Sequence, residues 1–330
     1  MNKVTIKEVA KEAGVSISTV SNALNDVDVL HPDTKAHVLE VAKRLHYIPN
    51  LNGRNLKSGA TKVIGMFVTY MGGPYMGALA DSMAKECSVA GYELNVFVTA
   101  RNQSIMANLL GHRVDGAVID GSILTKEEEN ALQEAELPVV YLNKEIAGAY
   151  QAGVFFDSYE AGRMAAKHLL SKGFKRLGFI KGNDNYDGKE RSRGFFSVLE
   201  EQHISLEEEF ILQGGFMRDL SYRNTKRFLE SRGMSKENLP QAFFAANDLS
   251  AIGCMEALLQ AGLRIPEDIG LMGCDDIELD KYLQPALTTI RTNFEEQGIQ
   301  AVRALLEMLA GEKQGSLHKL DCRLISRQSA

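Results

Sequence analysis

Five side chains of kinds that hold small polar molecules stand just after apolar runs in the sequence. They are one guanidinium, one carboxylate, one amide and two aromatic rings, contributed by Arg191, Asp275, Asn247, Tyr75 and Phe216. A planar cation, carboxylates and rings together suit a hydroxylated small molecule. Each residue alone would also fit an ordinary surface loop, so the prediction depends on their coming together in the fold.

Motifs for catalysis are missing from the sequence. No Gly-x-Gly-x-x-Gly, Gly-x-Ser-x-Gly or His-Glu-x-x-His occurs, and the seven histidines are scattered. The nearest phosphate-loop candidate, residues 182–190, has five residues between its glycines where four are needed. It also has Glu190 where a Ser or Thr should bind magnesium. We therefore expect no enzyme activity, no cofactor and no metal site.

Apolar runs separated by helix-like stretches must position the five side chains. Such runs are typical of strands that are buried in parallel sheets. They predict two doubly wound α/β subdomains in series, with a ligand at the carboxyl ends of the strands. A helix at about 159–171 connects the two sets of strands. The runs cover residues 63–68, 94–98, 116–119, 139–142, 177–180, 242–246 and 269–273, and a further strand is expected at 322–326.

The first 45 residues predict three helices. Thr5 and Glu8 fit a capping box that begins a helix at about residue 6, and Gly14 ends it because glycine tolerates positive φ. Ser16 caps a second helix over residues 17–25. Apolar residues at helical spacing predict a third helix from residue 32 or 33 to 45.

The first two helices carry the small residues that a helix-turn-helix requires at its crossing, namely Ala10, Gly14 and Val20. A generic helical hairpin is the alternative. The outer face of the second helix favours the helix-turn-helix, because it is short, polar and nearly uncharged and so suits a DNA major groove. That face consists of Ile17, Ser18, Ser21 and Asn22.

Charge is divided unevenly along the chain. Residues 1–58 contain eight Lys or Arg and six Asp or Glu, a net charge of +2, and the whole chain has −6, which leaves −8 for the remainder. This division favours DNA binding by the head alone, because phosphate contact needs local positive charge. The four cysteines lie far apart, and no apolar stretch has the length of a signal peptide or a membrane span. We therefore expect reduced thiols, no membrane partner and a cytoplasmic location.

Five segments together resemble the head of the lactose/galactose-repressor (LacI/GalR) family. They are Val-Thr-Ile-Lys-Glu-Val-Ala at 4–10, Ala-Gly-Val-Ser at 13–16, Thr-Val-Ser at 19–21, Leu-Asn at 24–25 and Tyr-Ile-Pro-Asn at 47–50. The resemblance extends over essentially the whole chain and is most specific in the first 58 residues. It implies a transcription regulator, a repressor, that binds a pseudo-palindromic operator in double-stranded DNA as a homodimer.

The same resemblance implies an all-α helix-turn-helix head and an α/β body like that of periplasmic binding proteins. The expected divisions are residues 1–48 for the DNA-binding domain, 49–60 for a hinge helix and linker, and 61–330 for the effector-binding and dimerisation domain. The body divides into an N-subdomain at about 61–158 and 292–320, and a C-subdomain at about 159–291 and 321–330. The segment 285–290 is a recurrent family segment that leads into the crossover back to the N-subdomain.

By resemblance, Ile17, Ser18 and Asn22 fall where the family chooses bases, and Leu56 falls where a hinge leucine wedges between base pairs. The Asn22 amide can pair bidentately with adenine, so an adenine is expected at its base pair. Gly53 and His31 depart from the family, and glycine in the hinge helix should cost roughly 1 kcal/mol of helix formation. The expected DNA contacts are Thr5, Ser16, Ile17, Ser18, Thr19, Ser21, Asn22, Asn25, Thr34, Tyr47, Asn50 and Leu56.

For the body, the resemblance implies that Arg191 and Asp275 contact a small-molecule effector. Arg101 and Asp157 are further candidates, whereas Asp248 is expected to be structural, as a cap of the next helix, and not an effector contact. Family frequency favours a sugar or sugar derivative, acting by inducing or by co-repressing, and a protein co-regulator stays open. No leucine-heptad tail follows the last expected strand, which favours a dimer over a tetramer. A solute-binding receptor shares the two-lobed body and is the alternative, but it would need a signal peptide in place of residues 1–58.

Overall fold

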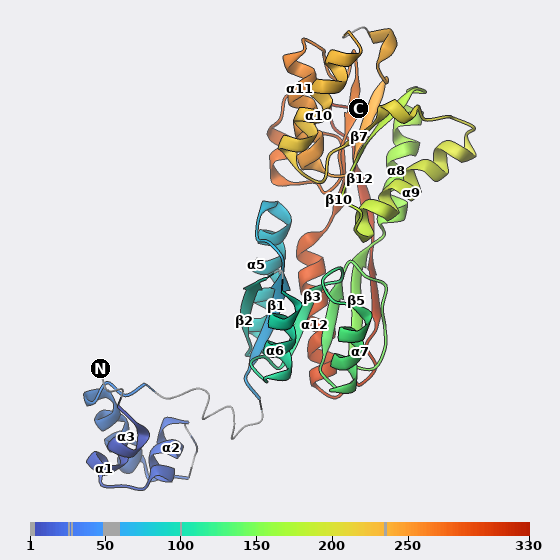
Figure 1. The fold of residues 1–330 in the computed structure, drawn as a ribbon. Coiled ribbons are helices and arrows are strands. Elements are labelled where there is room, and N and C mark those ends of the chain that lie inside the picture. Colours follow the sequence, from blue (N-terminus) through green and yellow to red (C-terminus); the bar gives the residue numbers. More distant parts are fainter. Residues whose placement is uncertain (1–3, 26, 28, 49–59, 100, 234–235) are drawn as a thin grey trace. The chain divides into compact units, whose positions relative to one another are not determined.

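The computed structural model describes residues 4–25, 27, 29–48, 60–99, 101–233 and 236–330. The chain divides into two compact units, Met1–Thr61 and Lys62–Ala330 (Figure 1). The predicted hinge helix, with Asn50, Gly53 and Leu56, lies outside the described residues.

The first unit is the predicted group of three helices. Its first helix begins where the Glu8 carboxylate accepts a hydrogen bond from the Thr5 amide at 2.7 Å. It ends at Gly14, whose φ of 68° suits glycine. His31 precedes the third helix without a side-chain cap, as the departure at that position predicts. The helices are α1 (Ile6–Ala13), α2 (Ile17–Leu24) and α3 (Pro32–Arg44), around a core of Val9, Ala10, Ala13, Val20, Ala23, Val38, Val41 and Ala42.

The second unit contains two parallel sheets, and we call the first sheet with its helices the N-lobe. Its strand order is β11-β5-β4-β3-β1-β2. Two helices pack on each face of this sheet, α5 with α12 on one and α6 with α7 on the other. The strands are β1 (Val63–Val68), β2 (Glu93–Val98), β3 (Gly116–Asp120), β4 (Val139–Leu142), β5 (Gln151–Phe156) and β11 (Leu317–Leu320). The helices are α5 (Gly73–Val89), α6 (Asn102–Leu110), α7 (Lys126–Glu134) and α12 (Phe294–Leu309).

The second sheet with its helices is the C-lobe, and its strand order is β7-β6-β8-β9. Here α8 and α9 cover one face and α10 and α11 the other. The strands are β6 (Leu177–Lys181), β7 (Ile211–Gln213), β8 (Ala242–Ala245) and β9 (Gly270–Met272). The helices are α8 (Ser158–Ser171), α9 (Tyr186–Glu201), α10 (Arg218–Ser231) and α11 (Asp248–Gln260), with short 3-10 helices η1 (Glu208–Phe210), η2 (Lys236–Asn238) and η3 (Glu278–Tyr282).

The chain passes between the lobes after β5, after β10 and after β11. The last two passages involve an antiparallel ribbon of β10 (Thr289–Thr292) and β12 (Cys322–Ile325). After β10 the chain enters α12, which packs against α5. The predicted pair of doubly wound subdomains and the predicted return of the chain to the first of them are therefore confirmed.

One strand prediction is wrong in an informative way. Residues 94–98 were expected to be buried, yet Val96 is 39% and Val98 55% exposed. The reason is that β2 is the last strand of its sheet, so it has a neighbour on one side only. The runs that form β5, β7, β10 and β11 were not predicted.

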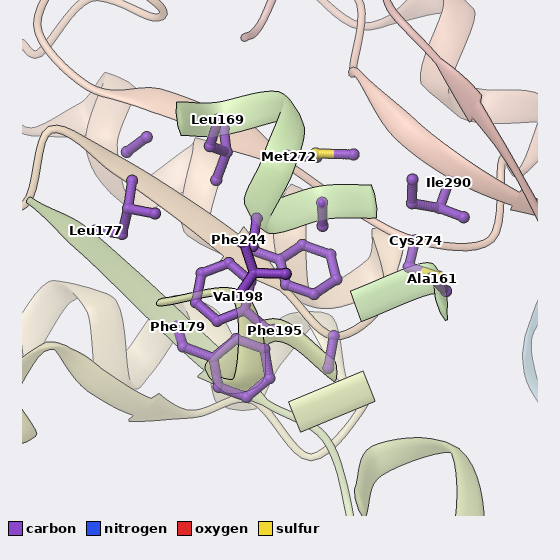
Figure 2. Close-up of a cluster of buried hydrophobic side chains, with 14 of the residues drawn as sticks. Ala161, Leu169, Leu177, Phe179, Phe195, Val198, Phe244, Met272, Cys274 and Ile290 are labelled. Carbon is purple, nitrogen blue, oxygen red and sulfur yellow. The ribbon is translucent and has the colours of Figure 1, made fainter. Parts of the chain in front are cut away.

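A cluster of aromatic rings fixes α9 on the second sheet (Figure 2). Phe195 of α9 lies 5.3 Å, centroid to centroid, from both Phe179 of β6 and Phe244 of β8. Helix α8 approaches α9 so closely that a Cβ at Gly162 or Gly194 would collide with backbone atoms of the other helix. This packing leaves α9 little freedom.

Candidate functional site

The outer face of α2, which the sequence predicts to contact DNA, is exposed or half-buried. Ser16 begins the helix, and its hydroxyl accepts a hydrogen bond from the Thr19 amide at 3.0 Å. Ile17 is 45% exposed, Ser18 is exposed, and Asn22 is half-buried. The face is free of charge and lies on one short helix.

The other predicted DNA contacts of the head lie around α2. Thr5 is exposed at the start of α1, where its hydroxyl donates to Glu8 at 2.9 Å. The Asn25 amide group is bonded to the Ser21 carbonyl at 2.8 Å, which ties it to the end of α2. Thr34 on α3 is half-buried, and Tyr47 packs against the head core.

Arg191 is the centre of a buried polar cluster in the C-lobe. Only 4% of the residue is exposed, and its Nη1 donates to the Ala246 carbonyl at 2.7 Å. The same nitrogen lies 3.4 Å from Asp275 Oδ1, and Nη2 lies 4.0 Å from Asp187 Oδ1. Burial raises the pKa of Asp275 well above its ordinary value, and Arg191 offsets this only in part. The predicted pair Arg191 and Asp275 is thus brought together, and Asp187 joins it.

Asn247 and Phe216 meet beside this cluster. Asn247 is 7% exposed, and its amide nitrogen donates to the Phe216 carbonyl at 3.3 Å. Its amide oxygen accepts from the Ser250 amide at 2.9 Å, so Asn247 caps α11. Asp248 does not cap this helix, but it has a structural role, as expected. It is fully buried and accepts from the Thr289 hydroxyl at 2.6 Å.

Tyr75 belongs to a hydrogen-bonded triad in the N-lobe. Its hydroxyl donates to Gln297 Oε1 at 2.9 Å and receives a bond from Asn143 Nδ2 at 3.4 Å. Gln297 Nε2 closes the triad by donating to Asn143 Oδ1 at 2.8 Å. The Tyr75 ring also packs edge-on against Phe294, with centroids 4.8 Å apart. The sequence reasoning missed Asn143, although it directly follows β4 and the same strand-end rule would have found it.

Electrostatics link the N-lobe tyrosines to the C-lobe carboxylates. Burial raises the pKa of Tyr75 well above its usual value, and the negative charges of Asp187 and Asp120 add to the rise. Burial also raises the pKa of Tyr70, with further contributions from Asp120 and Asp275. Tyr75 and Tyr70 of the N-lobe thus feel the negative charge of Asp187 and Asp275 in the C-lobe.

The two remaining candidates have other partners. Asp157 caps α8 by accepting from the Glu160 amide at 3.1 Å, and it pairs with Lys319 at 2.6 Å. Arg101 is exposed and precedes α6. Neither is bonded to the Arg191 cluster by any contact that the described residues make.

The described part of the chain lacks two kinds of feature. No group of three or more His, Cys, Asp or Glu side chains there is arranged to hold a metal ion. No helix there is long and apolar enough to span a membrane.

Sequence relatives are known for nearly the whole chain. Residues 5–50 match the bacterial regulatory proteins of the lacI family, and residues 166–330 match a periplasmic binding protein-like domain. The HTH-type transcriptional repressor PurR of Haemophilus influenzae (strain PittEE) is 34% identical over 317 residues, covering 94% of this chain and 93% of the repressor. PurR of Yersinia enterocolitica is 32% identical over 317 residues, covering 94% and 92%.

Solved structures agree with this relationship. The lac repressor dimer bound to operator and the anti-inducer ONPF shares the fold, with a TM-score of 0.85 at 24% identity and 99% coverage of both chains. A LacI-family regulator from Enterococcus faecium with bound ribose has a TM-score of 0.71 at 26% identity, covering 81% of this chain and 98% of that one. The chain therefore belongs to the LacI family of bacterial transcription regulators, and its PurR relatives are repressors.

Proposed function

We propose that the chain is a homodimeric repressor whose affinity for a pseudo-palindromic operator is controlled allosterically by a sugar or sugar derivative. Residues 1–48 read DNA, 49–60 form the hinge helix and linker, and 61–330 bind the effector and dimerise. The N-subdomain takes about 61–158 and 292–320, and the C-subdomain about 159–291 and 321–330. The protein acts in the cytoplasm, bound to the nucleoid when on its operator, and performs no catalytic step.

The observation that carries the effector proposal is the incomplete bonding of Arg191. Its Nε is buried, yet no described residue offers that nitrogen a hydrogen-bond acceptor. A buried donor without a partner is costly, so a ligand oxygen would stabilise it. Asp187 and Asp275 stand beside the same guanidinium and can accept from ligand hydroxyls.

The charge of the cluster favours a neutral ligand. Two carboxyl groups accompany a single guanidinium, and burial already opposes the ionisation of Asp275. A phosphate or carboxylate on the ligand would add a further negative charge to this buried region. Sugar hydroxyls can donate to the carboxyl groups and accept from Arg191, and the E. faecium regulator was solved with ribose bound. We therefore favour a neutral sugar.

A thermal-shift screen tests this effector class. Neutral sugars, sugar acids, phosphorylated sugars and purines are added separately to the purified chain. A neutral sugar at a hundredfold excess over its Kd should add about 2.7 kcal/mol to the free energy of unfolding. Asp187→Asn should lose the shift, and Asp268→Asn, a buried carboxylate elsewhere in the C-lobe, should keep it. A shift with purines alone would refute the sugar assignment, and no shift at all would refute the effector site.

For DNA reading, we propose that α2 enters the major groove. Ile17, Ser18 and Asn22 then face base edges, and Asn22 pairs with adenine. The uncharged outer face of α2 supports this proposal, because its short polar side chains can form hydrogen bonds with base edges. Binding-site selection with Asn22→Arg should replace that adenine by guanine. An unchanged preference at every half-site position would refute the assignment.

The hinge leucine is proposed to widen the minor groove at the operator centre. Leu56→Ala should weaken operator binding far more than binding to random DNA, because wedging a base step gives specificity through deformation. Equal losses on the two DNAs would contradict this role.

A dimer is supported by the apolar edge of the N-lobe. Val96 and Val98 of β2 are exposed at the end of the sheet, and Val89 at the end of α5 is 87% exposed. An exposed apolar edge strand invites pairing with another chain. Sedimentation velocity should give a dimer for the natural chain and a monomer for Val96→Lys. A natural chain that sediments as a monomer or a tetramer would contradict the proposal.

Control of DNA binding is proposed to pass through lobe closure. Three chain passages join the lobes, and such connections permit hinge motion about a ligand. Effector binding then shifts closure, which alters the separation of the two hinges in the dimer and hence operator affinity.

A further inference from the structure

Asp275 and Asp276 are two successive non-glycine residues with positive φ, of 137° and 60°. A residue with a Cβ is strained in this backbone region, so its neighbours must hold it there. The segment follows β9 and presents the Asp275 carboxylate to Arg191. What holds the segment therefore also determines where that carboxylate points.

The Asp276 side chain is held by two guanidinium groups. Its Oδ2 accepts from Arg291 Nε at 2.5 Å, and its Oδ1 accepts from Arg327 Nη2 at 2.5 Å. The Asp276 side chain is 5% exposed and that of Arg327 is 18% exposed. Arg327 is fixed in turn, because its Nη1 donates to the Leu287 carbonyl at 2.7 Å. Two charge-assisted bonds to a buried carboxylate are the strong kind.

One arginine lies in the ribbon through which the chain passes between the lobes, and the other lies just after it. Arg291 lies in β10, which leads into α12 of the N-lobe, and Arg327 closely follows β12, which is entered from β11. The backbone of Asp275 bonds to the same ribbon. Its amide donates to the Ile290 carbonyl at 2.7 Å, and its carbonyl accepts from the Thr292 amide at 3.3 Å.

We propose that Asp276 is a positioning residue for Asp275. Its bonds to Arg291 and Arg327 hold the strained backbone, keep the Asp275 carboxylate 3.4 Å from Arg191, and connect that carboxylate to β10 and to the segment that follows β12. The role of Asp276 in ligand binding rests on the proposed function, in which Asp275 contacts the effector. The placement of Asp275 itself does not depend on any ligand.

Hydrogen exchange of the full ligand-free chain gives the first test. Asp276→Asn keeps the size of the side chain, and asparagine tolerates positive φ, so mainly the charge is lost. The amides of Asp275 and Thr292 should exchange about tenfold faster, as expected for losing a charge-assisted bond. Asp268→Asn is the matched control, because Asp268 is a buried carboxylate paired with Arg264 in the same lobe. Unchanged exchange in Asp276→Asn would overturn the proposal.

A double-mutant cycle separates positioning from a merely structural ion pair. Unfolding by denaturant is measured for Asp275→Asn, Asp276→Asn and the double variant. If Asp276 acts through Asp275, Asp276→Asn should lower the free energy of unfolding only about half as much in the Asp275→Asn background as in the natural chain. Strict additivity, as expected for the parallel cycle with Asp268→Asn, would overturn the proposal.

If Asp276→Asn does not fold, Arg327→Lys replaces it in both experiments. Lysine keeps the positive charge but lacks the planar fork, so the same exchange and coupling changes are expected, on a smaller scale. Their absence in Arg327→Lys would again overturn the proposal. Both experiments are done without a ligand, so they test the role of Asp276 even if no compound in the thermal-shift screen binds.

Discussion

The head and the body differ in where their predicted contact residues lie and in how far these residues are buried. In the head, the predicted base-reading residues Ile17, Ser18 and Asn22 stand on eight residues of one helix, exposed or half-buried and uncharged. In the body, the predicted effector contacts are charged, amide or aromatic side chains, and they are buried or half-buried. They are brought together from distant segments, and Tyr75 and Gln297 are 222 positions apart.

This difference predicts different consequences of mutation. An exposed neutral residue can change without much effect on stability, so head substitutions should alter specificity with little loss of folding. Removing a buried charge leaves its partners without a counter-charge. Body substitutions should therefore alter both ligand specificity and the stability of the fold.

The largest effect is expected for Arg191→Leu. It would leave Asp187 and Asp275 buried without their cation, which typically costs about 3–5 kcal/mol. Denaturant unfolding of the body should show this loss. The comparison is Asn22→Ala in the head, which should stay within about 0.5 kcal/mol of the natural chain. Similar stabilities for the two variants would break the contrast.

Asp280→Asn should reveal a dependence of stability on pH that belongs to the body. Burial, with the neighbouring Asp248 carboxylate, raises the pKa of Asp280 to about 10. An acid whose pKa is higher when folded contributes full stability below its ordinary pKa and loses it as the pH rises toward the folded value. Between pH 6 and 8 the natural chain should therefore lose up to about 1.4 kcal/mol per pH unit relative to Asp280→Asn.

Unfolding measured at several pH values checks this prediction. The difference between the two chains should change steadily with pH above about pH 4 and level off below it, where Asp280 is protonated in both the folded and the unfolded chain. A constant difference would mean that Asp280 is ionised in the folded protein.

Ala10→Leu tests the packing of the head. Ala10 is 5% exposed where α1 and α2 cross, so a larger side chain must separate the helices. Overpacking of this kind costs about 1–3 kcal/mol. Thermal unfolding of the head and binding to selected DNA should both decline. Ala36→Leu on the exposed side of α3 is the control, and equal behaviour of the two variants would contradict the predicted crossing.

The smallest effect compares two helix caps. Ser16→Ala should cost about 1 kcal/mol through loss of its bond to the Thr19 amide. Asn247→Ala should cost more, because Asn247 is buried and also bonds to the Phe216 carbonyl. The denaturant midpoints of the two variants show which substitution costs more stability. Equal costs would show that burial does not make the Asn247 cap more important than the Ser16 cap.

The same contrast explains what the sequence could predict. Local signals such as the Thr5–Glu8 capping box and Gly14 predict helices α1 to α3. These signals lie within the helix ends and do not depend on residues far away in the sequence. Arg191 and Asp275 were found because both follow strands of a regular α/β pattern. Asp187, on the first turn of α9, and Gln297, on a helix that returns from the far end of the chain, carry no local signal. Their roles depend on tertiary packing.

Strand predictions failed for a related reason. Apolar runs identified strands such as β1 and β8, but a run does not reveal its place in the sheet. Residues 94–98 look buried by composition, yet Val96 and Val98 are exposed because β2 is an edge strand. β11, with the sequence Leu-His-Lys-Leu, is too polar to be noticed and forms only because β5 offers a partner.

Above all, we propose that a ligand at the Arg191 cluster controls DNA binding by the head. The most direct test is fluorescence anisotropy with a duplex selected from a randomised library by the natural chain. The sugar that stabilises the protein in the thermal-shift screen should change the affinity for this duplex. In Arg191→Lys, which keeps the charge but loses the planar fork, that change should disappear while ligand-free binding persists. A full response in Arg191→Lys would contradict the account.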